Sequence, residues 1–162
     1  MKNDMGSASS EQKDRLKSQK AFQLRRRMAR SLALQFIFQM DIRKETSYDQ
    51  EELARFQATW LQDEEQRKAW KYAQKIIQGT YLHLPDIDRC LQEAASNWTL
   101  SRMSYMDRSI MRMAVFEIAF AEKKLPVVAI NEAVELAKTY SDAGAAAFVN
   151  GILDKVRKNC SV

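Results

Sequence analysis

The amino-acid sequence predicts an all-α protein. Apolar residues recur at steps of three and four along most of the chain, which is the spacing of one face of an α-helix. No stretch alternates apolar and polar residues as a half-buried β-strand does. The 162 residues include only four glycines and two prolines, so the sequence offers few tight turns.

The length favours one domain. A chain of 162 residues can bury one hydrophobic core and is too short for two full domains. We expect residues 19–162 to form this domain from about seven helices. Residues 1–18 are polar and basic without an apolar period, so we expect a flexible, disordered arm there.

The first expected helix covers residues 19–41. One face carries the apolar residues Met28, Ala29, Leu32, Phe36 and Met40, which we expect to lie in the core. Arg26, Arg27 and Arg30 are expected to project from the opposite side. Further apolar residues follow on that side, namely Leu34, Ile37 and Phe38. A helix that is apolar all round is either central in its domain or meets a partner, and both possibilities stay open.

The next three expected helices have clear start and stop signals. Residues 47–61 form the second, with Asp49 as the N-cap that accepts a backbone N–H. Residues 63–84 form the third, which ends where proline interrupts the pattern. Pro85 suits the first turn of a fourth helix that runs to about residue 97.

The second half of the chain predicts three more helices. They cover residues 104–123, 126–140 and 148–158, and residues 141–147 connect the last two. Gly151 lies inside the last helix, where glycine costs about 1 kcal/mol relative to alanine. We expect a close helix–helix approach at this glycine to compensate.

Few residues suit catalysis or metal binding. The single histidine, His83, excludes most multi-histidine metal sites and makes a catalytic triad improbable. The sequence has no Cys-x-x-Cys and no glycine-rich nucleotide loop. We expect Cys90 and Cys160 to be free thiols in a reducing compartment. The expected protein is therefore not an enzyme and has no metal and no cofactor.

No segment predicts a membrane protein. No apolar run approaches the roughly 20 residues that a membrane-spanning helix needs. The N-terminus also lacks the apolar core of a signal peptide. We therefore expect a cytoplasmic protein without membrane contacts.

Positive charge is concentrated at the N-terminus. Residues 1–30 contain nine Lys or Arg and three Asp or Glu, and subtraction from the totals of 26 and 21 leaves 17 basic and 18 acidic residues elsewhere. An N-terminal segment of net +6 therefore precedes a body of net −1. The usual partner of such a field is a polyanion, most often nucleic acid.

Three segments resemble the NusB family of transcription antitermination factors. The first is RRMARSLALQFIF at residues 26–38, which is similar to the opening helix of the family. The second extends over residues 98–118 and includes DRSIMRMAVFEI. The third is PVVAINEAVELAK at residues 126–138, continued by FVNGILD at residues 148–154. This last pair is the most specific, and the resemblance covers about residues 25–158.

The resemblance implies both a fold and a function. The implied fold has two perpendicular three-helix bundles that share one core, with an extra helix linking them. The implied function is RNA binding: such proteins bind the boxA element of nascent transcripts, notably ribosomal RNA leaders. They do so with the ribosomal protein NusE, and the complex makes RNA polymerase resist termination.

The resemblance also implies which residues make these contacts. The expected RNA contacts are Arg25, Arg26, Arg27, Arg30 and Phe148. The expected partner contacts are Phe38, which matches a tyrosine near the NusE surface, and Asp142. Residues 145–147 are alanines where many relatives have polar side chains, so we expect more of the RNA affinity to come from the arm.

Other classes of function remain possible from the sequence. One is the NusB-like RNA-binding module of ribosomal RNA cytosine methyltransferases, disfavoured because no catalytic domain follows. Another is a protein–protein adaptor or homodimer whose interface is formed by Leu34, Ile37 and Phe38. An α-helical enzyme is the weakest alternative, because no candidate active site is present.

Overall fold

The computed structural model describes the backbone of residues 5–160 and side chains from residue 9 onward. This part of the chain contains seven α-helices and no strand, which confirms the all-α prediction. The helices are α1 (Met5–Ile42), α2 (Gln50–Trp60), α3 (Glu64–Leu82), α4 (Leu84–Ala94), α5 (Tyr105–Val115), α6 (Pro126–Tyr140) and α7 (Ala145–Asn159). A short 3-10 turn, Leu100–Arg102, precedes α5, and a π-helical turn, Phe116–Phe120, continues it. None of the described helices is both long and apolar enough to span a membrane.

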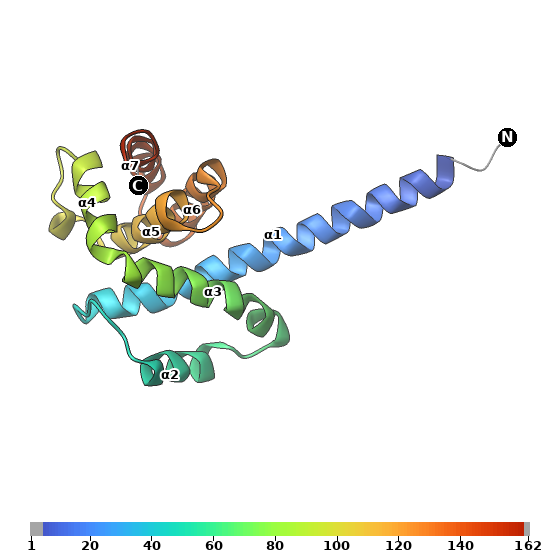
Figure 1. The fold of residues 1–162 in the computed structure, drawn as a ribbon, viewed down its shortest axis with the longest axis horizontal. Coiled ribbons are helices and arrows are strands. Elements are labelled where there is room, and N and C mark those ends of the chain that lie inside the picture. Colours follow the sequence, from blue (N-terminus) through green and yellow to red (C-terminus); the bar gives the residue numbers. More distant parts are fainter. Residues whose placement is uncertain (1–4, 161–162) are drawn as a thin grey trace.

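The helices form two groups that share one core, as the resemblance implied. Helices α1, α2 and α3 form the first group, in which α1 and α3 pack along each other. Helices α5, α6 and α7 pack together as the second group, and α4 joins the two. In Figure 1, α7 is seen nearly end-on whereas α1 and α3 extend across the view, so α7 crosses these two helices steeply. Buried side chains of both groups belong to one continuous cluster.

The C-terminal half of α1 lies at the centre of this core. Its predicted inner face is buried or half-buried, and Leu34 and Ile37 on the other side are buried as well. The apolar surface of this helix therefore contacts α3 and α5 of the same chain. An interface with a second copy through Leu34 and Ile37 is excluded by their burial. Phe38 is half-buried.

Most predicted helix boundaries are confirmed. Asp49 and Asp63 each accept a backbone N–H in a capping box at the start of α2 and α3, and Pro85 lies in the first turn of α4. The start of α7 differs, because this helix begins at Ala145 and not at residue 148. Residues 145–147 are alanines, the strongest helix formers, so the helix extends back to Gly144 at φ +90°.

The N-terminal arm differs from the sequence prediction. Helix α1 continues without a break to Met5, so the described part of the predicted disordered segment 1–18 is helical. Residues 9–25 are exposed throughout and project from the body (Figure 1). Extending an existing helix requires no new nucleation, and residues 9–25 contain no glycine or proline. The helical state of the arm therefore follows from its continuity with the core helix.

The prediction that Cys90 and Cys160 are free thiols is wrong. Cys90 on α4 and Cys160, which directly follows α7, are joined as a disulfide, with their Cα atoms 5.8 Å apart. Helices α4 and α7 pack together and bring the two cysteines within the usual bridging distance. A separation of seventy residues in sequence gives no sign of this proximity.

The expected close approach at Gly151 is also wrong. Gly151 is exposed, and a Cβ atom built there would have no other atom within 4 Å. The tight contact is at Gly79 on α3, where a Cβ atom would collide with the ring of Phe116. Gly79 thus lets the π-helical turn pack directly against α3, which positions the neighbouring Glu117.

Candidate nucleic-acid interface

The predicted arginine site lies where α1 leaves the body of the protein. Successive residues of a helix point about 100° apart, so the arginines at 25, 26, 27 and 30 face different surroundings. Around them, α3 contributes Tyr72, the π-helical turn contributes Glu117 and α6 contributes Glu132. The arginines consequently divide into one buried and three accessible side chains.

Arg30 is a core residue. Its exposed fraction is only 7%, and it donates two parallel hydrogen bonds to Glu117: Nε to Oε2 at 3.0 Å and Nη2 to Oε1 at 2.9 Å. Burial acts to lower the pKa of Arg30, but the hydrogen bond and negative charge of Glu117 outweigh it, so this pKa is raised. Arg30 was predicted to project from the side of α1 opposite the core, but this side is covered at Arg30 and its side chain is buried. Its bidentate geometry and its burial hold α1 against the π-helical turn.

Tyr72 connects this buried pair to the surface. Its hydroxyl donates a hydrogen bond to Glu117, and its ring lies 3.5 Å from the guanidinium carbon of Arg26. Burial raises the pKa of Tyr72 to about 12, and the negative charge of Glu117 adds to the effect. The phenol therefore stays neutral at neutral pH. Its ring face orients Arg26 by a cation–π contact.

The accessible arginines are suited to an anionic ligand. Arg26 is half-exposed, and its N–H groups make no hydrogen bond within the described residues. Arg27 has 57% of its side chain exposed and pairs with Glu132 through Nε at 3.1 Å. Surface pairs of this kind contribute little, about 0–1 kcal/mol, so a phosphate group can compete for Arg27. Arg25 is exposed.

Phe148 lies in a separate place. It is half-buried at the start of α7 and meets Trp98 edge-to-face, with the ring centroids 5.6 Å apart. The two rings line a groove of about 260 Å³ between the end of α4 and α7, together with Gly151 and Lys155. Trp98 is 53% exposed and was not predicted as a contact residue. Asp142 is exposed in the turn before α7.

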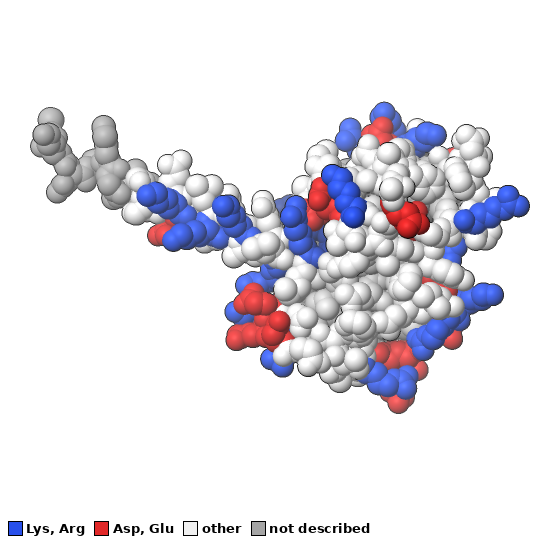
Figure 2. Space-filling model, turned by 180° about the vertical axis from the view of Figure 1, so that it is seen from behind, with Lys and Arg blue, Asp and Glu red and all other residues white. Residues whose placement is uncertain are grey.

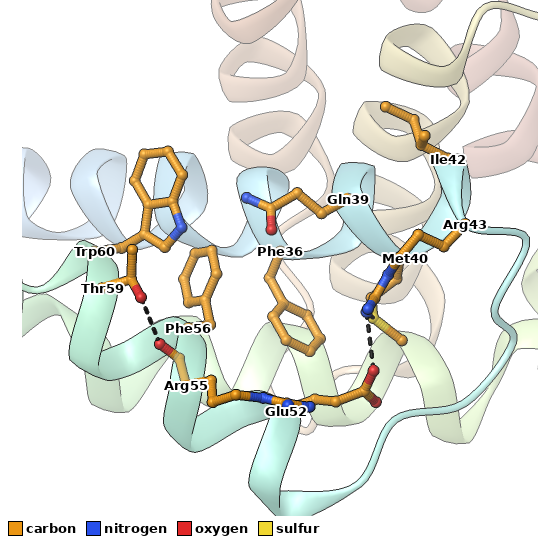
Figure 3. A pocket seen from close by; sticks show the side chains of 10 residues that line it. All are labelled: Phe36, Gln39, Met40, Ile42, Arg43, Glu52, Arg55, Phe56, Thr59 and Trp60. Carbon is orange, nitrogen blue, oxygen red and sulfur yellow. Dashed lines mark hydrogen bonds and ion pairs between the residues drawn. The ribbon is translucent and has the colours of Figure 1, made fainter.

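The predicted partner residue Phe38 is likewise remote from the arginines. It lies eleven residues beyond Arg27 on α1, about 16 Å along the helix axis. A cavity of about 520 Å³ opens between this end of α1 and α2, and Arg43 pairs with Glu52 across it at 2.9 Å (Figure 3). Its apolar lining comes from Phe36, Met40, Ile42, Phe56 and Trp60. Phe38 does not line this cavity.

A second buried ionic cluster fixes the C-terminal end of α1. Asp41 accepts hydrogen bonds from Arg108 at 2.9 Å and Arg112 at 3.2 Å, and Arg112 also binds Asp88. Arg112 and Glu117, five residues apart, therefore pair with other elements and not with each other. Both ends of the buried half of α1 are thus held by arginine–carboxylate pairs.

The residues that complete the arginine site were missed from the sequence. Tyr72 is one of several aromatic residues on an amphipathic helix, and Glu117 and Glu132 are acids on helices of ordinary composition. Their roles depend on packing between elements that are 45 to 105 residues apart. No local pattern indicates such contacts.

Comparisons with known proteins agree with the fold. The model of the NusB family matches residues 27–158. The transcription antitermination protein NusB of Symbiobacterium thermophilum is 41% identical over 134 residues, covering 81% of this chain and 88% of that protein. NusB of Desulfotalea psychrophila is 42% identical over 136 residues, covering 83% and 96%.

Solved structures give the same result. T. maritima NusB aligns with a TM-score of 0.68 at 30% identity, covering 83% of this chain and 91% of that one. The antitermination factor in a complex of NusB and NusE with dsRNA aligns with a TM-score of 0.71 at 26% identity, covering 83% and 96%. The relatives named here are transcription factors and not enzymes. The chain belongs to the NusB family.

Proposed function

We propose that this protein is an RNA-binding transcription antitermination factor of the cytoplasm. Its RNA target is a boxA-type single-stranded element, notably in ribosomal RNA leader transcripts. It binds this element together with the ribosomal protein NusE, and the assembly makes RNA polymerase resist termination. Arg25, Arg26, Arg27 and Phe148 contribute the RNA contacts, whereas Arg30 supports them from the core.

The observation that carries this proposal is the geometry at Arg26. A guanidinium that stacks on a tyrosine ring keeps its N–H edges free for phosphate or for a base edge. Arg27 and Arg25 lie next to it on the same exposed turn of α1. This arrangement provides several phosphate contacts on an ordered backbone.

The aromatic groove supports a second contact. Sequence-specific proteins bind single-stranded RNA by stacking unpaired bases on aromatic side chains. Phe148 and Trp98 offer such a surface, and Lys155 at the same groove suits the adjoining phosphate. Phe38 and Asp142 are the proposed contacts to NusE, and a solved NusB relative was crystallised with NusE and RNA.

Fluorescence anisotropy tests the function directly. A labelled boxA-like RNA and a scrambled RNA of equal length are titrated with the protein, with and without NusE. When NusE is present, we expect the boxA-like RNA to bind at least tenfold more tightly than the scrambled RNA. Equal binding to both RNAs under both conditions contradicts the proposal.

A further inference from the structure

The arm is the part of the molecule that the family does not account for. The family model begins at residue 27, so α1 up to Arg26 lies outside the matched region. The arm is nevertheless continuous with the helix that carries Arg26 and Arg27. Its orientation relative to those arginines is therefore defined by the helix.

Three lysines of the arm share one face with Arg27. Taking Lys13 as the origin and about 100° per residue, Lys17 lies at about +40°, Lys20 at about −20° and Arg27 at about −40°. The four side chains form one basic stripe, about 21 Å long at 1.5 Å per residue. All four positions are exposed.

The three lysines of the stripe have no acid on their own face of the helix, and Arg27 at its end pairs with Glu132. The two acids of the described arm, Glu11 and Asp14, lie about 160° and 100° from Lys13 around the helix. Among the described residues, Lys13, Lys17 and Lys20 have no ion-pair partner. Figure 2 shows basic side chains along the projecting helix with little acidic surface beside them.

We propose that the stripe of Lys13, Lys17, Lys20 and Arg27 binds the phosphate backbone of the same RNA that the arginine site binds. This inference rests on the proposed function, because the RNA held by Arg26 and Arg27 must continue along the arm. Charge complementarity identifies the occupant, since three unpaired lysines in line with the mostly exposed Arg27 match a polyanion. The continuous helix keeps the lysines in fixed register with Arg27.

The distribution of apolar residues disfavours a membrane surface as the occupant. A membrane-bound helix needs one apolar face opposite its basic face. Leu24 lies within the basic stripe, at about +20°, and Phe22 lies on the far side, at about 180°. Phe22 contacts the guanidinium of Arg26, 4.8 Å from its ring centroid. In the described part of the arm, Leu24 and Phe22 therefore do not form one apolar face opposite the lysines.

Neutralising the lysines tests the contacts. The variant K13Q/K17Q/K20Q should lower the slope of log affinity against log salt by about 2, at roughly 0.7 per contact with single strands. Between 50 and 200 mM salt, the parent should then lose about twentyfold more affinity than the variant. The control K44Q/R55Q/R89Q removes three charges from exposed positions away from the arm and should leave the slope unchanged. Unchanged binding by the lysine variant, or an equal loss in the control, overturns the proposal.

Helix insertions test the fixed register. Two alanines inserted after Gln23 turn the arm by about 200°, whereas four turn it by about 40° net, and neither changes the charge. We expect the two-residue insertion to bind RNA like the lysine variant and the four-residue insertion to bind like the parent. If both insertion variants bind RNA equally tightly, the lysines are not held in fixed register with Arg27, because a flexible basic tail would behave in that way.

Two further measurements separate this inference from other outcomes. Sedimentation with anionic phosphatidylglycerol vesicles should show no binding that depends on the lysines; lysine-dependent vesicle binding with unchanged RNA binding overturns the proposal. The affinity for scrambled RNA is recorded in parallel. If the preference for boxA-like RNA fails while the lysines still set the salt slope, the arm proposal stands and the proposed function does not.

Discussion

The two halves of α1 have the same secondary structure and opposite surroundings. Residues 9–25 are exposed on every side, whereas most of residues 29–40 are buried. The transition takes place over a single turn, and the arginines at 26, 27 and 30 fall within it. The first half contributes charge and the second contributes the core.

This contrast shows that charge alone does not identify a ligand contact. Arg27 and Arg30 differ by one helical turn and both pair with a glutamate, yet one is mostly exposed and the other is 7% exposed. The difference comes from neighbouring elements: the π-helical turn covers Arg30, whereas α6 only touches Arg27. An arginine in the sequence predicts a polar partner. The burial of its side chain decides whether that partner is another residue of the protein or an external anion.

The largest expected effect is at the buried pair. Arg30→Met leaves the carboxylate of Glu117 buried without its partner, which we expect to lower the free energy of unfolding by about 3–5 kcal/mol. Urea denaturation at pH 7 measures this change. The double variant R30M/E117L should recover most of the loss, because no unpaired charge remains. A loss below about 1 kcal/mol for R30M would show that Arg30 is not part of the core.

An intermediate effect is expected from Tyr72, which contacts both halves of the site. Its pKa is raised to about 12 in the folded protein, above the value of 10 for an exposed tyrosine. The resulting stabilisation is fully present below pH 10 and is lost as the pH rises towards 12, because the unfolded state releases the proton first. We expect Tyr72→Phe to be less stable than the parent at pH 7 but to lose less stability between pH 9 and pH 11. If the free energy of unfolding falls equally in parent and variant between pH 9 and pH 11, this account is contradicted.

The smallest effect is expected from the arm. The described side chains that removal of residues 1–18 takes away, those of residues 9–18, are all exposed. The free energy of unfolding should therefore change by less than about 0.5 kcal/mol. Thermal and urea unfolding of the shortened protein measure this directly. A larger loss would mean that the arm packs against the body and is not a free extension.

Much of the fold could be predicted from the sequence. The bounds of α6 were predicted to the residue, because a proline starts the helix and its apolar spacing is regular. The capping residues Asp49 and Asp63 and the break at Pro85 are local signals as well. Such features depend on neighbours within one helical turn.

The remaining features depend on contacts that local patterns do not contain. The disulfide, the close packing at Gly79 and the burial of Arg30 all join elements far apart in the chain. Gly151 shows the converse, since a glycine inside a helix did not mark a close approach. For the site, the sequence indicated the arginine cluster. Only the packing of α3, the π-helical turn and α6 shows that Arg30 is buried whereas Arg26 and Arg27 are accessible.

The central claim is that Arg26 and Arg27 bind RNA whereas Arg30 holds the fold. Its most direct test measures RNA affinity across salt concentrations and urea stability on two proteins, R26A/R27A and R30M/E117L. We predict that R26A/R27A weakens RNA binding at least tenfold and lowers the salt slope by about 1.4, with unfolding changed by less than about 1 kcal/mol. R30M/E117L should bind RNA like the parent. Parent-like RNA binding by R26A/R27A, or its loss in a folded R30M/E117L, would contradict the claim.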